Sequence, residues 1–137
     1  MPLYNTATVA AALGVPPKWL DNLLSHNKID GVSGGRQGVQ RRLSADAVRV
    51  VALAKELIEH AALSAPAAVG IAAILVADTI TDGRIASRQP VRLSPSVWIE
   101  LDVGALEREI SAGLAHAVEV TPHPRRGRPR RVAGRSS

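Results

Sequence analysis

TATVAAALGVPPKWLDNLL, residues 6–24, contains the signals for two short helices joined by a tight turn. Thr6 is a favourable N-cap, and apolar residues recur at helical spacing after it. These residues are Val9, Ala10 and Leu13. Gly14 ends the first helix and permits a sharp turn. The second helix starts at Pro16-Pro17, where proline is tolerated because the first N–H groups of a helix have no partner.

The second helix has one apolar and one polar face. Leu20, Leu23 and Leu24 form the apolar stripe that we expect to face inward. The residues expected to point outward are Lys18, Asp21, Asn22 and Ser25. Two short helices joined in this way form a helix-turn-helix, whose second helix commonly enters the major groove of DNA.

A glycine-rich segment, GVSGGRQGVQRRL at residues 31–43, follows the second helix. Its four glycines mark turns. Val39 and Leu43 bracket a short strand that carries Arg41 and Arg42. The segment therefore predicts a two-stranded wing with Arg36 near its tip.

Helical periodicity returns after the wing. Ser44 caps a predicted helix that runs to about His60, and Ser64 caps another that runs to about Ala77. We expect residues 78–83 to form a loop. The fold class predicted for the chain is mainly α with a small amount of β, and residues 1–80 are expected to form its winged helix-turn-helix domain.

These segments, taken in order, resemble the DNA-binding domain of MerR-like regulators over about residues 4–77, and the related excisionase-type winged helix is similar. The resemblance rests on the order of the helices, the LGV turn and the RRLS start of the third helix. It implies that the second helix lies in the major groove and the wing on flanking phosphates. By position, it assigns Lys18, Asn22 and Ser25 to base edges or nearby phosphates. It assigns Arg36, Arg41 and Arg42 to the DNA backbone.

The chain departs from that family at three points. Asp21 stands where a basic residue is usual, so it must accept from a cytosine amino group or pair with a neighbour such as Lys18. The family's long C-terminal coiled-coil helix is not evident. The chain also has neither the cysteine ligands of the metal sensors nor an aromatic-rich drug pocket. We therefore expect no small-molecule effector.

Residues 84–120 predict a short strand-and-helix element. Val97, Ile99 and Leu101 alternate with polar or aromatic residues, and one or two strands are expected within 84–101. Asp102 can cap a helix from Val103 to about Val120. Its expected apolar face is Leu106, Ile110, Leu114, Ala117 and Val118, and its expected exposed residues are Glu107, Arg108 and Glu109.

Such an element cannot close a core alone. It must pack on residues 1–80 or on a second copy of the chain. The second option is favoured because winged-helix regulators usually bind paired half-sites as symmetric dimers. Trp98, on the outward face of its strand, is consistent with a covered interface.

The C-terminal segment, residues 121–137, includes RRGRPRR at 125–131 and carries six arginines and no acid, whereas residues 61–121 carry seven acids and four bases. Its composition predicts disorder in the free chain. The run resembles the AT-hook, with Arg126, Gly127, Arg128 and Pro129 as its core. The resemblance implies a place in a narrow A·T-rich minor groove, with Arg125, Arg130 and Arg131 on phosphates. A generic basic tail is the alternative.

Composition excludes several other functions. The chain has no cysteine, its four histidines lack metal-ligand spacing, and no nucleophile motif is present. We expect neither an enzyme, a metal nor a cofactor. The N-terminus lacks the features of a signal peptide, and the uncharged run 61–77 is short and alanine-rich, so a cytoplasmic protein without a membrane span is expected.

The leading hypothesis is a dimeric regulator of transcription, most simply a repressor, that binds double-stranded DNA. An architectural, xenogeneic-silencer or excisionase-like DNA-binding factor is the first alternative. The second is an antitoxin-like adaptor, in which residues 84–120 bind another protein.

Overall fold

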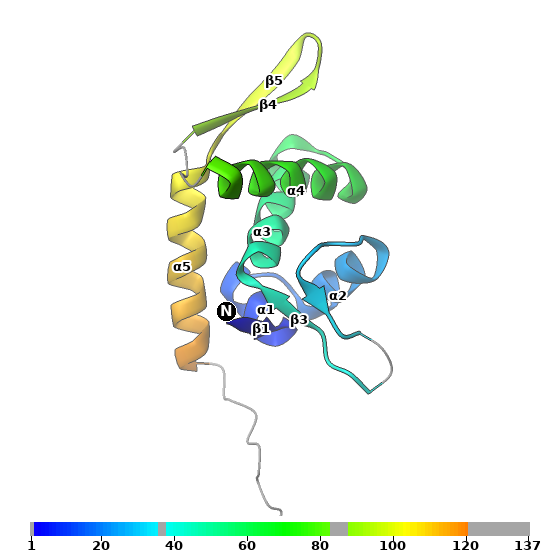
Figure 1. Ribbon diagram of the computed structural model, residues 1–137, viewed down its shortest axis with the longest axis vertical. Coiled ribbons are helices and arrows are strands. Elements are labelled where there is room, and N and C mark those ends of the chain that lie inside the picture. Colours follow the sequence, from blue (N-terminus) through cyan, green and yellow to red (C-terminus); the bar gives the residue numbers. More distant parts are fainter. Residues whose placement is uncertain (1, 36–37, 83–87, 121–137) are drawn as a thin grey trace, which may run out of the picture.

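The computed structural model describes residues 2–35, 38–82 and 88–120. Its elements follow in this order: β1 (Leu3–Asn5), α1 (Thr6–Leu13), α2 (Pro17–His26), β2 (Val32–Ser33), β3 (Arg42–Ser44), α3 (Ala45–Ala61), α4 (Ala65–Asp82), β4 (Arg88–Ser94), β5 (Val97–Asp102) and α5 (Val103–Val120). The chain is mainly helical with small antiparallel sheets, which confirms the predicted fold class at this coarse level (Figure 1).

The first sheet has three very short strands in the order β1-β3-β2, all antiparallel to their neighbours. Leu43 of β3 pairs with Tyr4 on one side and with Val32 on the other, and its side chain is fully buried. Strand β1 was not expected from the sequence. Its three residues are too few to show strand periodicity, and the strand exists because β3 offers it a free edge.

Helices α1 and α2 form as predicted, with a shift of one residue at the first cap. Asn5, rather than Thr6, caps α1, because its side-chain oxygen accepts a hydrogen bond from the Thr8 amide at 2.8 Å. Gly14 adopts a left-handed conformation, with φ of 69°, and donates its N–H to the last carbonyls of α1. The predicted inward stripe of α2, Leu20, Leu23 and Leu24, is buried. The turn therefore packs two short helices onto one core.

Helix α3 is the centre of that core. The hydroxyl of Ser44 accepts from the Ala47 amide at 3.1 Å, so the predicted cap is confirmed. Eight residues of α3 are buried, among them Val48, Val51 and Leu57. Helix α3 packs against α4, which contributes Ala68, Val69, Ala72 and Val76 to the same buried cluster. Residues 71–82 contain no glycine or proline, and α4 continues to Asp82, so the loop predicted from residue 78 is wrong as far as Asp82.

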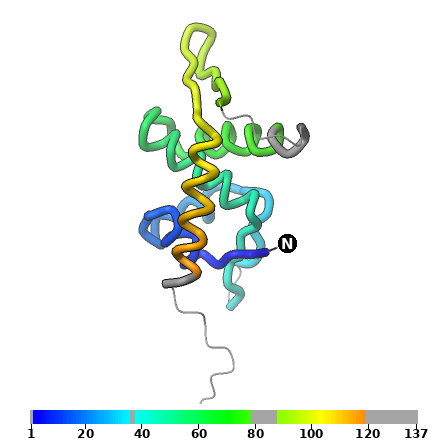
Figure 2. Tube along the Cα trace, turned by 90° about the vertical axis from the view of Figure 1, so that its left-hand side faces the viewer, coloured from blue at the N-terminus to red at the C-terminus, as the bar shows by residue number. Residues whose placement is uncertain are grey.

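Residues 88–120 form a hairpin, β4–β5, followed by α5. The hairpin extends away from the rest of the chain, while α5 runs along α3 and α1 (Figures 1 and 2). The Asp102 carboxylate accepts from the Ala105 amide at 2.9 Å, as its predicted cap role requires. Both strands lie where one or two were expected.

Helix α5 packs on its own chain, which corrects the preference for packing on a second copy. Ile110 belongs to the same buried cluster as α1 and α3 and is only 6% exposed. Gly113 lies so close to α1 that a Cβ there would overlap the carbonyl oxygen of Ala12. A small residue at the crossing point permits this approach. Of the predicted apolar face, Val118 is exposed.

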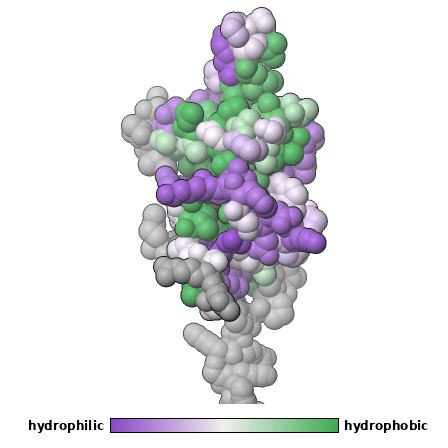
Figure 3. Space-filling model, turned by 90° about the vertical axis from the view of Figure 1, so that its right-hand side faces the viewer, coloured by the Kyte–Doolittle hydropathy of each residue, from purple (hydrophilic) through white to green (hydrophobic). Residues whose placement is uncertain are grey.

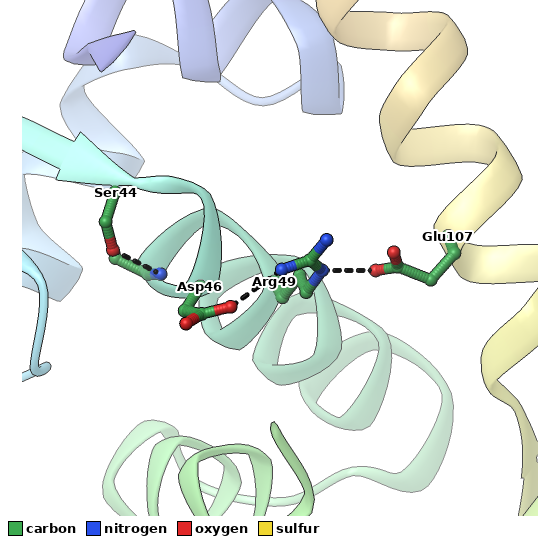
Figure 4. A network of polar contacts seen from close by, with 5 residues as sticks. Ser44, Asp46, Arg49 and Glu107 are labelled. Carbon is green, nitrogen blue, oxygen red and sulfur yellow. Dashed lines mark hydrogen bonds and ion pairs between the residues drawn. The ribbon is translucent and has the colours of Figure 1, made fainter. Parts of the chain in front are cut away.

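One polar contact ties α5 to α3 (Figure 4). Arg49 donates to Glu107 and to Asp46, each at 2.7 Å. The hydrogen bond with Glu107 raises the pKa of the Arg49 guanidinium above its already basic value. Glu107 was predicted to be exposed, but its side chain is largely covered because it meets an arginine 58 residues earlier in the chain.

Within the described part of the chain, no helix has both the length and the apolar character needed to cross a lipid bilayer.

Candidate nucleic-acid interface

The polar face of α2 is exposed and continuous. Lys18, Asn22 and Ser25 lie three and four residues apart, which places them on one side of the helix. All three are exposed, while the three leucines between them are buried. Hydrophilic residues form a band across the middle of the molecular face that carries α2, and hydrophobic residues gather above it, over α4 and the hairpin (Figure 3).

The segment between β2 and β3 is closed by backbone contacts. Gly31 has φ of 94° and accepts a hydrogen bond from the Ser44 amide at 2.9 Å. A Cβ on Gly31 would overlap the Ser44 hydroxyl. Gly35 donates to the Val39 carbonyl at 3.0 Å. These contacts bring Arg42, the first residue of β3, and Arg41, which precedes the strand instead of lying in it as predicted, back beside α2.

Arg41 joins this segment to α2. Its guanidinium donates to Asp21 Oδ1 at 3.5 Å and to Ser25 Oγ at 3.1 Å. The side chain of Arg41 is 23% exposed and that of Asp21 is 58% exposed. Asp21 therefore pairs with Arg41, not with Lys18 as the sequence analysis considered. The pair neutralises the only acid on the exposed face of α2.

The remaining predicted site residues divide into two groups. Arg42 is exposed and pairs, through its backbone, with Ser33 and Asn5. Arg36 and the tail residues Arg125, Arg126, Gly127, Arg128, Pro129, Arg130 and Arg131 lie outside the described residues. The structure thus brings together four of the six predicted residues of α2 and the wing on one side of the chain: Lys18, Asn22, Ser25 and Arg41.

Sequence reasoning missed two features of this region. The first is the partner of Asp21, which depends on the register of β3 and cannot be inferred from helical spacing. The second is Lys28, an exposed base two residues after the end of α2. Its position next to a predicted recognition helix was the available signal.

A second polar cluster lies on α3, away from α2. Glu56, Glu59 and His60 bring their oxygen and nitrogen atoms within 4.8 Å of one another. Their spacing of three and four residues on a helix was the sequence signal for this cluster. Lys55 already pairs with Glu59 at 3.2 Å and with Glu56 at 3.6 Å. The carboxylates are therefore partly neutralised by an ammonium group, and this cluster is a solvated salt-bridge network.

Comparison with protein-family models, with curated proteins and with solved structures gives no match for this chain.

Proposed function

We propose that the chain binds double-stranded DNA through α2 and regulates transcription, most simply as a repressor. The observation that carries the proposal is the exposed polar face of α2, with its acid neutralised by Arg41. In this proposal, α1, the turn at Gly14 and α2 are a helix-turn-helix, and β2, β3 and their connection are its wing. Apart from Asp21, this exposed face carries Lys18, Asn22 and Ser25, whose side chains can all donate hydrogen bonds to DNA.

The proposed roles follow from the side-chain chemistry. Asn22 can form paired hydrogen bonds with an adenine edge, and Lys18 can donate to a guanine or to a phosphate. Arg42, exposed on β3, supplies a phosphate contact. Arg41, held by Asp21 and Ser25, braces the wing against α2 and keeps its remaining N–H groups available.

The C-terminal tail adds a second contact in this proposal. Its arginines enter an A·T-rich minor groove next to the site of α2, where the narrow groove concentrates negative potential. The supporting observation is the sequence RRGRPRR itself. If it is a generic basic tail, the same arginines meet phosphates without preference for A·T base pairs.

The proposal also includes a homodimer on paired half-sites. Large apolar side chains remain exposed on the hairpin and on α4: Trp98, Val97 and Ile74. Their exposure supports this assembly, in which a symmetric partner would cover them. The molar mass of the full chain in solution, free and on DNA, tests it, and a monomer in both states contradicts it.

The experiment that tests the function is genome-wide recovery of DNA fragments bound by the full chain and by a chain ending at Val120. The shorter chain retains every described helix and strand. We expect both to recover the same few sites, the shorter chain more weakly. Broad A·T-rich coverage that disappears without the tail would favour an architectural factor or silencer. Recovery no better than that of an unrelated protein would refute DNA binding.

A further inference from the structure

A groove opens along the inner side of α5, on a face that the proposed DNA interface does not use. Its larger part, about 270 Å³, lies between α3, β5 and α5. A smaller part, about 70 Å³, lies between α1, α3 and α5. Both parts are lined by Glu56, Leu106 and Glu109. The two parts adjoin at these residues, and together they form a groove that runs from the base of the hairpin toward the crossing of α5 with α1.

The groove has an apolar floor and an acidic rim. Leu53, Leu101 and Leu106 line its floor. Its rim carries the four carboxylates Glu56, Glu100, Asp102 and Glu109. Lys55 is the one base among the lining residues, and Arg88 lies 3.6 Å from Glu100. Acids still outnumber bases when both are counted, so the groove favours a cationic occupant.

The dimensions of the groove indicate what kind of occupant fits. Its larger part is below the usual size of a pocket for a small-molecule ligand, and neither part has room for a helix. An extended segment that inserts single side chains does fit. Arginine suits an apolar floor with an acidic rim, because its methylene stem packs on leucine while its guanidinium pairs with a carboxylate.

We propose that the groove binds the arginine-rich tail of the same chain, residues 125–131, when DNA is absent. The charges are complementary, since residues 122–137 carry six arginines and no acid. The tail begins after Val120, at the far end of α5 from the hairpin.

The tail is long enough to reach the groove. Helix α5 rises about 16 Å between Glu109 and Val120, and about 22 Å between Ala105 and Val120. An extended chain of six residues spans about 20 Å, and one of eight spans about 26 Å, so each leaves about 4 Å for the chain to reverse direction. Arg126 can therefore return to the level of Glu109, and Arg128 to the level of the hairpin base.

The docked tail changes how the chain meets DNA. Arginines held by the groove must leave it before they enter a minor groove or meet phosphates, so the acidic groove competes with DNA for the tail. The docking itself is independent of DNA binding, and only this consequence rests on the proposed function.

Paramagnetic NMR on the full chain tests the docking without DNA. The chain has no cysteine, so Ser136→Cys gives a single site for a nitroxide label. At about 0.1 M salt, where the Debye length is about 10 Å, we expect amides of the groove to lose most of their intensity and those of α2 to keep theirs. At about 1 M salt, where the Debye length falls to about 3 Å, the loss should disappear.

Three outcomes overturn the proposal. The first is an equal loss of intensity by the amides of α2 and of the groove, and the second is no loss by either set. The third outcome is broadening that persists when an isotope-labelled chain without nitroxide is mixed with a nitroxide-labelled chain without isotope. That result places the tail on a second copy.

A matched pair of variants tests which carboxylates hold the tail. Glu100→Gln with Glu109→Gln removes two charges from the rim and should abolish the broadening. The control, Asp30→Asn with Asp78→Asn, removes two exposed charges that do not line the groove and should leave it unchanged. Equal effects of the two pairs would show that net charge, not the groove, attracts the tail.

The same variants separate docking from DNA binding. If docking competes with DNA, the groove variant should bind a duplex about two- to tenfold more tightly than the control variant, as expected for loss of two exposed ion pairs. Equal DNA affinity of the two variants would show that docking of the tail does not compete with DNA binding. Failure of every variant to bind DNA would refute the proposed function and leave the NMR result standing.

Discussion

Replacement of Gly113 by alanine tests whether α5 belongs to the core of its own chain. The added methyl group would overlap the carbonyl oxygen of Ala12. That atom belongs to the backbone of α1, so no side-chain rotation can make room. Helix α5 must move away from α1, and the packing around Ile110 must loosen with it.

The magnitude follows from two opposing terms. Overpacking at a tight contact costs about 1–3 kcal/mol. Alanine in the interior of a helix is more favourable than glycine by about 0.8–1 kcal/mol. We therefore expect Gly113→Ala to lower the free energy of unfolding by about 1 kcal/mol.

Gly70→Ala is the matched control. Gly70 also lies inside a helix, α4, and a Cβ there meets nothing within 4 Å. Only the propensity term applies, so this variant should gain up to about 1 kcal/mol. Urea unfolding of both variants, followed by circular dichroism, should separate them by about 2 kcal/mol. Equal stabilisation by the two substitutions would refute the packing of α5 on α1.

Three further predictions concern ionic contacts. Arg49→Met should cost about 1–2 kcal/mol of unfolding free energy, measured in urea, because it removes a charge-assisted bond to Glu107 that is only partly exposed to solvent. Since that bond raises the pKa of Arg49, its contribution is present from neutral pH up to the ordinary arginine value. The cost should therefore be the same at neutral and mildly alkaline pH, and a cost that shrinks on going to alkaline pH contradicts this. Asp21→Asn should change stability by less than about 1 kcal/mol, yet free Arg41 for phosphate and steepen the log–log salt dependence of DNA binding by up to about one unit; a shallower slope argues against that role. A chain ending at Val120 should show a salt dependence flatter by up to about five units, and an unchanged slope means that the tail does not touch DNA.

Local signals in the sequence were sufficient for most of the fold. The leucine stripe of α2 and the caps at Ser44 and Asp102 involve residues at most four apart, and all three predictions are confirmed. Helix periodicity and capping are properties of short windows, so they can be recognised without knowledge of the tertiary structure.

Most of the predictions that were wrong or missing concern features that depend on residues distant in the sequence. Strand β1 depends on an edge supplied by β3, about forty residues later in the sequence. The covered position of Glu107 depends on Arg49, and the packing of α5 depends on the small residue Gly113 at its crossing with α1. Helix α4 continues past its predicted end because residues 78–82 contain neither glycine nor proline, so no strong helix-breaking residue stops it there.

The candidate site also combines features that local sequence signals predict with features that depend on distant residues. Helical spacing placed Lys18, Asn22 and Ser25 on one exposed face, as the structure has them. The contact of Arg41 with Asp21 and Ser25 required the return of β3 beside α2. The acidic groove along α5 requires three helices and a strand in place, so no local pattern in the sequence predicts it.

The most direct test of the central claim is the affinity of the full chain for a duplex that it selects from a random library, compared with that for a scrambled duplex. Loss of paired hydrogen bonds to one base costs about 1–3 kcal/mol. Asn22→Ala should therefore weaken binding to the selected duplex about tenfold and leave the scrambled duplex unaffected, while Ser111→Ala, exposed on α5, should change neither. Equal behaviour of Asn22→Ala and the unaltered chain on both duplexes would contradict the claim that α2 reads DNA.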